Sequence, residues 1–243
     1  MIETPPAAIS LPDRLNAVRR EIAACALRSN QTAGEITLVA VSKTHPPELI
    51  REAIAAGVTD LGENRVQEAD AKIPAVGRKA ARWHLIGHLQ SNKARSAVEL
   101  FDVIHSLDSV KLAQRLDRAC EEINREVLRV LIQVDLGKET TKTGAAESDV
   151  PKIVEAIAQL RTLRLTGLMT LPPYFDDPEN GRPFFRRLRE LRDELRAQGA
   201  FADQSGELSM GMTHDYQIAI EEGATIVRIG TAIFGTRAAK TEN

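Results

Sequence analysis

Lys43 is the residue of this chain whose type and position most directly suggest covalent chemistry. It follows an apolar run at 36–42 and precedes the helix-opening pair Pro46 and Pro47, so its amine lies where a buried strand ends. Burial disfavours the ammonium ion, and the neutral amine attacks aldehydes and ketones. The position therefore indicates Schiff-base chemistry. The alternative is a lysine at a strand end whose ammonium group simply extends into water, which would give the same sequence pattern.

A second set of residues, in the C-terminal third, suits a phosphate group. Small and hydroxylated residues occur there in two short segments that would face each other, Ser209 to Thr213 and Arg228 to Thr231, and Gly230 permits close approach of a ligand. Backbone N–H groups, hydroxyls and helix N-termini converge on phosphate in such segments. The alternative is that the glycines only shape turns and that Thr213 caps a helix beginning near residue 215. Together with Lys43, the two segments predict a site for a phosphate-bearing aldehyde.

Eight short runs rich in β-branched residues must position these side chains. They lie at 36–42, 59–62, 83–87, 103–106, 128–136, 165–170, 207–211 and 226–229, and helical patterns occupy most of the gaps. Such alternation is typical of a parallel sheet, and eight repeats match a closed barrel rather than an open sheet. We therefore predict an α/β fold in the form of a single (β/α)₈ TIM-type barrel. Lys43 and the phosphate segments then meet at one mouth of this barrel.

The boundaries of the predicted domain follow from the same patterns. We expect one domain over 1–243, with a helical segment at about 10–28 and the barrel at about 36–240. A late helix has an apolar stripe that consists of Phe184, Leu188, Leu191 and Leu195. Helical segments end at Gly57, Gly199 and Gly223, where glycine relieves the steric cost of a left-handed cap. The segment 172–181 reads as a loop that forms part of a lid.

Composition excludes several classes of function. Lys plus Arg number 32 against 34 Asp plus Glu, so the net charge of −2 gives no broad basic field for nucleic acid or an anionic membrane. Cys25 and Cys120 are the only cysteines, too few for a disulfide framework, and they favour a reducing cytoplasm. No run approaches the roughly 18 apolar residues of a membrane span, and the N-terminus has no secretion signal. We expect a cytoplasmic monomer.

Histidine spacing predicts no metal site. His84 and His88 are four residues apart, which on a helix would place both imidazoles on one face. The run 83–87 reads as a strand, however, where positions four apart lie roughly 13 Å from each other, too far to share a metal ion. His45, His105 and His214 form no ligand pattern.

Five runs together resemble the pyridoxal phosphate homeostasis protein family. They are VAVSK at 39–43, GENRVQE at 62–68, WHLIGHLQSNK at 83–93, SMGM at 209–212 and VRIGTAIFG at 227–235. The family is similar to the barrel domain of alanine racemase. The resemblance implies that Lys43 carries pyridoxal 5′-phosphate as a Schiff base and that the protein buffers or delivers this cofactor inside the cell. The expected partners are the cofactor and the apoenzymes that use it.

The resemblance also assigns residues one by one. Arg228 matches an arginine that faces the pyridine nitrogen; a guanidinium keeps its proton, so the ring nitrogen stays unprotonated and the ring is a weaker electron sink. Gly230 and Thr231 match a phosphate-binding turn, with the facing loop formed by Ser209, Met210 and Thr213, where many relatives have serine at the last position. Asn64 and His84 match positions near the ring, and Met169 would pack against it. For His84 and Met169, a purely structural place in the core is the alternative.

Three functions remain open from the sequence. The first is a non-catalytic carrier in pyridoxal phosphate homeostasis, and the second is a weak racemase or transaminase-like enzyme that uses the same cofactor. Racemisation needs two positioned acid–base groups, and alanine racemases supply the second as a tyrosine from an additional domain, for which we expect no room here. The third is an aldolase whose Schiff-base lysine works without pyridoxal phosphate. We expect the carrier.

Overall fold

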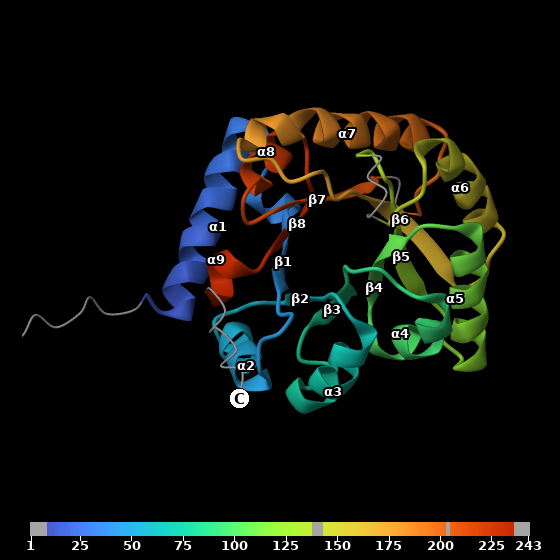
Figure 1. Cartoon of the computed structure of the whole chain (residues 1–243), viewed down its shortest axis with the longest axis horizontal. Helices are drawn as coiled ribbons and strands as arrows, with labels where there is room; N and C mark the ends of the chain where they lie inside the picture. Colours follow the sequence, from blue (N-terminus) through green and yellow to red (C-terminus); the bar gives the residue numbers. More distant parts are fainter. Residues whose placement is uncertain (1–8, 138–142, 203–204, 236–243) are drawn as a thin grey trace, which may run out of the picture.

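The strands form one closed parallel barrel in the computed structural model, which describes residues 9–137, 143–202 and 205–235 (Figure 1). Each strand pairs with its successor in the sequence, and β8 pairs with β1. The strands are β1 (Thr37–Val41), β2 (Asp60–Glu63), β3 (Arg82–Leu85), β4 (Val103–Leu107), β5 (Leu128–Gln133), β6 (Leu163–Met169), β7 (Glu207–Met212) and β8 (Ile226–Ile229). The predicted (β/α)₈ barrel is therefore confirmed.

The ring of helices around this barrel follows the order of the sequence (Figure 1). The helices are α1 (Leu11–Arg28), α2 (Pro47–Ala55), α3 (Val66–Val76), α4 (Ala94–Leu100), α5 (Val110–Glu122), α6 (Val150–Ala158), α7 (Arg182–Ala197), α8 (Tyr216–Glu221) and α9 (Thr231–Phe234). Short 3₁₀ helices occur at Ala33–Glu35, Ser91–Lys93, Glu147–Asp149 and Pro178–Gly181. The segment α1 precedes the barrel as expected and packs against α8 and α9. The expected end of the barrel at residue 240 lies outside the described residues.

Two predictions about local structure need correction. The strand predicted at 128–136 ends at Gln133, because Val134 makes only a single bridge, to Ala145, and the chain then leaves the sheet. In α7, the apolar stripe contains Phe185 rather than Phe184: Phe185 is fully buried, whereas Phe184 is partly exposed and stacks on Phe175. The three leucines of the stripe are buried as predicted, and only its first position differs, because either phenylalanine keeps a helical spacing to Leu188.

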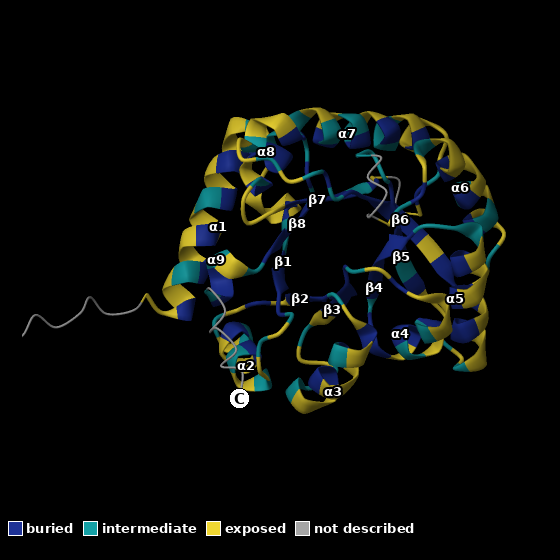
Figure 2. Ribbon diagram, viewed as in Figure 1, coloured by how far each residue is buried: buried dark blue, intermediate teal, exposed yellow. Residues whose placement is uncertain are grey.

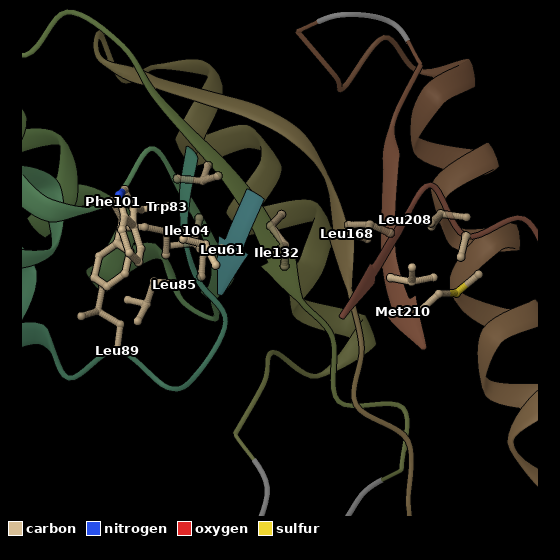
Figure 3. Packing of buried hydrophobic residues seen from close by; sticks show 14 of the residues in the cluster. Leu61, Trp83, Leu85, Leu89, Phe101, Ile104, Ile132, Leu168, Leu208 and Met210 are labelled. Atoms are coloured by element: carbon tan, nitrogen blue, oxygen red, sulfur yellow. The ribbon is translucent and has the colours of Figure 1, made fainter. Parts of the chain in front are cut away.

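The apolar residues form two clusters on opposite sides of the barrel wall. The larger cluster fills the layer between strands and helices, where Trp83, Phe101 and Leu208 lie among the residues drawn in Figure 3. Buried faces of the helices turn toward the strands and exposed faces turn outward (Figure 2). A smaller cluster occupies the barrel interior and consists of Val39, Val103, Leu131, Met169 and Ile226. Side chains of a strand alternate between these two environments, so polar residues at inward positions are enclosed by the barrel.

Local backbone geometry confirms the predicted helix ends. Gly57, Gly199 and Gly223 have φ values of 93°, 73° and 95°, in the left-handed region that glycine tolerates best. Within the described residues, no helix is both long enough and apolar enough to cross a membrane.

Candidate functional site

A cavity of about 620 Å³ opens at the mouth of the barrel formed by the carboxyl ends of the strands. Its volume is in the range of small-molecule sites, and this mouth is where barrels of this type carry their active sites. It is lined by Val41, Lys43, Asn64, Ile86, Gly87, His88, Leu171, Pro172, Pro173, Tyr174, Phe175, Pro178, Gly181, Met212, Thr213, His214, Asp215, Arg228, Gly230 and Thr231. The lysine and the phosphate segments singled out in the sequence therefore share one cavity.

The backbone on both sides of Lys43 is held by buried charges. Lys72 Nζ donates to the Ser42 carbonyl at 2.9 Å and to carboxylate oxygens of Glu63 and Glu68, each at 2.7 Å. The Ser42 hydroxyl donates to Glu63 at 2.6 Å, and the Thr44 amide donates to Glu68. Thr44 has a φ of 65°, an uncommon conformation for a β-branched residue. These contacts fix the turn that presents Lys43, and we call Glu63, Glu68 and Lys72 the lysine-turn triad.

The two carboxylates of the triad differ in their environment. Burial raises the pKa of Glu63, and the hydrogen bonds from Lys72 and Ser42 offset this only in part. Burial acts in the same direction on Glu68, but there the hydrogen bonds from Lys72 and Thr44 dominate and the pKa is lowered. Glu63 Oε2 is buried and has no hydrogen-bond partner among the described residues. Lys72 thus contacts two carboxylates whose pKa values are shifted in opposite directions, upward for the buried Glu63 and downward for the more exposed Glu68.

Arg228 lines the same cavity from inside the barrel wall. Its Nη1 donates to Ser209 Oγ at 2.6 Å and its Nη2 donates to the Thr170 carbonyl at 2.9 Å. Burial lowers its pKa to about 10, so the guanidinium is still protonated at neutral pH. These two bonds use two of the five N–H donors of a guanidinium and fix its plane. An acceptor placed in the cavity can take a further bond from it.

The predicted phosphate turn lies beside these residues. Gly230 directly precedes α9, whose first N–H groups have no carbonyl partner within the helix. A Cβ added at Gly230 would lie 3.3 Å from the Val41 carbonyl oxygen, which is a tight contact. Thr231 follows, and Thr213 faces it from the loop after β7. Asp215, not Thr213, occupies the N-cap position of α8, so the capping alternative for Thr213 is wrong.

Six of the ten predicted site residues line the cavity, and four do not. The six are Lys43, Asn64, Thr213, Arg228, Gly230 and Thr231. Met169 is fully buried in the interior cluster, and Met210 is fully buried in the outer layer. His84 and Ser209 lie inside the barrel and bond to other polar side chains rather than lining the cavity. The core alternative thus describes the positions of His84 and Met169.

Sequence reasoning missed the aromatic rim of the cavity. The Tyr174 and His214 rings stack with centroids 5.2 Å apart, and His214 Nε2 donates to the Phe175 carbonyl at 3.1 Å. The loops after β6 and β7 therefore meet over the cavity. In the sequence, the only indication of this rim was the loop at 172–181, which we interpreted as part of a lid. In the structure, Leu171, Pro172 and Pro173 also line the cavity, between the rim and the end of β6.

The donor set of the cavity suits a flat, anionic carbonyl compound. An amine nucleophile, a buried guanidinium, threonine hydroxyls and the start of α9 lie around apolar walls that include Val41, Ile86 and Leu171. No group of three or more metal-ligating side chains occurs in the part of the chain that the structure describes.

The sequence as a whole matches known proteins of one family. The model of the alanine racemase N-terminal domain matches residues 14–238. A protein of Aquifex aeolicus named pyridoxal phosphate homeostasis protein is 44% identical over 225 residues, which cover 93% of this chain and 97% of the relative. The Escherichia coli K12 protein of the same name is 42% identical over 226 residues, which cover 90% of this chain and 94% of that protein.

Solved structures agree with this match. PipY of Synechococcus elongatus, in a structure with PLP bound, has a TM-score of 0.79 and 40% identity, covering 93% of this chain and 100% of that chain. Without PLP, the TM-score is 0.82 at 41% identity over the same shares of both chains. An alanine racemase of Clostridium difficile has a TM-score of 0.69 at 16% identity and is matched over 57% of its length, which shows a shared fold and nothing more.

Proposed function

Because this chain belongs to the pyridoxal phosphate homeostasis proteins, a family built on the alanine racemase N-terminal domain, we propose that it binds pyridoxal 5′-phosphate on Lys43 and serves as a carrier of this cofactor. The observation that carries the proposal is the single cavity shared by Lys43, Arg228 and the Gly230–Thr231 turn. An amine, a fixed cation and a phosphate cradle are the groups that this cofactor needs.

Each group has a distinct role in the proposal. Lys43 forms the covalent link, in which its amine adds to an aldehyde carbon and water leaves. Arg228 bonds to the ring nitrogen, and Gly230, Thr231 and Thr213 bind the phosphate. The bound cofactor supplies an electrophilic aldehyde and an electron sink. Asn64 lies beside the ring, while Ser209, His84, Met169 and Met210 support the site from the barrel wall.

The carrier role, rather than catalytic turnover, is part of the proposal. Besides Lys43 and Arg228, four titratable side chains line the cavity: His88, Tyr174, His214 and Asp215. Tyr174 is 74% exposed and its ring stacks on His214, so neither is held opposite Lys43 as an enclosed second acid. We further propose that the protein is a cytoplasmic monomer with one domain. The buried free thiols of Cys25 and Cys120 support a reducing compartment.

Transfer of cofactor tests the carrier directly. The protein loaded with pyridoxal 5′-phosphate is mixed with a cofactor-dependent apoenzyme while a phosphatase destroys the free cofactor. We expect reactivation of the apoenzyme by wild type, and none by Lys43→Ala after the same loading. Interconversion of L- and D-amino acids by wild type that is lost in Lys43→Ala would instead support the enzyme. Lysine trapping by borohydride only with a substrate carbonyl would support the aldolase.

A further inference from the structure

A chain of side-chain hydrogen bonds crosses the barrel interior from Arg228 to Asp60. Arg228 Nη1 donates to Ser209 Oγ at 2.6 Å, and Ser209 Oγ lies 2.9 Å from His105 Nδ1. His105 Nε2 lies 2.8 Å from His84 Nδ1, and His84 Nε2 lies 2.9 Å from Asp60 Oδ1. All five side chains are buried. We call them the Asp60–Arg228 chain.

This chain links the two ends of the barrel. Its members come from β8, β7, β4, β3 and β2, and the contact between His105 on β4 and Ser209 on β7 crosses the interior between strands that are not neighbours (Figure 1). Arg228 lines the large cavity, whereas Asp60 is the first residue of β2 and lines a separate cavity of about 490 Å³ with Gly57 and Thr59.

The chemistry of the two ends determines the direction of every bond. A guanidinium only donates, so Ser209 Oγ must accept from Arg228. Burial raises the pKa of Asp60, but the hydrogen bonds from His84 and Thr59 and the charge of Arg82 outweigh it and the pKa is lowered, so the ionised carboxylate only accepts. His84 therefore carries its proton on Nε2. If His84 is neutral, its Nδ1 accepts from His105 Nε2–H, and His105 Nδ1 accepts the Ser209 hydroxyl proton.

Only this arrangement gives each hydrogen one acceptor along the chain. An additional proton on either imidazole would make His105 Nδ1 a donor toward Ser209 Oγ. Ser209 Oγ would then accept two hydrogen bonds, one from Arg228 and one from His105. Its own hydroxyl hydrogen would have no acceptor left in the chain. Burial, and then the charges of the Arg228 and Arg129 guanidinium groups, hold the pKa of His105 well below its ordinary value. Arg82, 3.6 Å from Asp60, adds to the positive field at that end, and Asp215 faces Arg228 at the other.

We propose that Asp60 is the distant counter-charge of Arg228. His84 and His105, as neutral Nε2–H tautomers, and Ser209 are positioning residues that connect the two charges through hydrogen bonds. Hydrogen bonds that point one way polarise one another. Ser209 Oγ, which donates toward Asp60, thus becomes a stronger acceptor for Arg228 and holds the guanidinium plane that lines the cavity. Of the five side chains, only Arg228 lines the large cavity.

The protonation pattern can be tested on the protein without cofactor. We expect ¹⁵N-detected NMR at neutral pH to show a protonated Nε2 and a bare Nδ1 for both His84 and His105, and a His105 signal that stays unchanged between about pH 5.5 and 8.5. Assignment uses His84→Gln and His105→Gln. A proton on Nδ1 of either residue at neutral pH, or titration of His105 within this range, would overturn the proposal.

Coupling is tested by a double-mutant cycle on cofactor affinity. We expect Asp60→Asn and Ser209→Ala each to weaken binding by about fivefold and the double variant by no more than the larger single effect, because both break one chain. Asp102→Asn is the matched control: Asp102 lies just before β4, near the start of a strand as Asp60 does, and it bonds to Arg78 and the Trp83 amide, outside the chain. Additive effects, or an equal effect in the control, would contradict the coupling. The affinity measurement rests on the proposed function, whereas the NMR measurement does not. A wild-type protein that binds no cofactor would therefore refute the proposed function and leave the protonation pattern to be decided by NMR.

Discussion

Lys72 Nζ lies 2.9 Å from the backbone carbonyl of Ser42, one residue before Lys43. The same ammonium group bonds to Glu63 and Glu68, and Glu68 accepts from the amide of Thr44, one residue after Lys43. Lys43, to which we assign the Schiff base, therefore lies on a turn that a second, buried lysine holds in place. The two lysines therefore have different environments: Lys72 forms buried ion pairs, whereas Lys43 lines the cavity.

Removal of the positive charge of Lys72 should destabilise the fold and the turn. We expect Lys72→Met to lower the free energy of unfolding by about 3 kcal/mol, because two carboxylates lose a buried partner. Urea unfolding measures this. Lys152→Met is the control, since Lys152 is 76% exposed in its pair with Asp149, and it should change stability by less than about 0.5 kcal/mol. An equally small loss for Lys72→Met would show that the triad does not support the turn.

Gly230→Ala should weaken cofactor binding with little effect on stability. The added Cβ would lie 3.3 Å from the Val41 carbonyl oxygen and displace the turn that we assign to the phosphate. We expect about tenfold weaker binding of pyridoxal 5′-phosphate in a titration followed by absorbance, a loss of about 1.4 kcal/mol. Gly34→Ala is the control, because a Cβ there meets no atom within 4 Å. Unchanged affinity in Gly230→Ala would remove the turn from the site.

Acid should destabilise the protein through His105 before the carboxylates titrate. The folded-state pKa of His105 lies well below its ordinary value of 6.5, so the unfolded chain takes up a proton first as the pH falls below 6.5. The contribution of His105 is present above that pH and is lost toward lower pH by about 1.4 kcal/mol per unit. We expect the loss of unfolding free energy between pH 6.5 and 5.5 to be smaller in His105→Gln by about 1 kcal/mol, because half of the unfolded imidazoles are already protonated at pH 6.5.

The exposed His88 serves as the control for this slope. His88→Gln should retain the wild-type dependence on pH, because that side chain is exposed and lies outside the barrel interior. Equal slopes for wild type and His105→Gln would mean that His105 takes up a proton in the folded state, contrary to the environment that the barrel gives it.

The sequence predicted the fold and the cavity better than the polar interior. Lys43, Arg228 and Gly230 follow or end strands of a parallel barrel, and topology alone brings such positions to one mouth. Alternation along the strands would place Asp60, His84 and His105 inside, but their contacts depend on strand register and barrel tilt, which local spacing does not encode.

The lysine-turn triad had a partial signal that sequence reasoning did not use. Glu68 and Lys72 are separated by four residues on a helix and were visible as an ion pair, and Glu63 lies in the same run as Glu68. The burial of Glu63 could not be anticipated, because a charged residue at a strand end is usually exposed. Phe184 and Phe185 both fit the apolar stripe of α7, and only packing against the barrel distinguishes them.

Trapping of Lys43 tests the central claim most directly. The purified protein, incubated with pyridoxal 5′-phosphate, is reduced with borohydride and digested, and the modified peptide is identified by mass spectrometry. Lys43→Ala and Lys72→Met are treated in parallel. We predict a yellow wild type whose reduced cofactor is attached at Lys43, and a colourless Lys43→Ala. A protein that takes up no added cofactor, or carries it on another lysine, would contradict the proposed site.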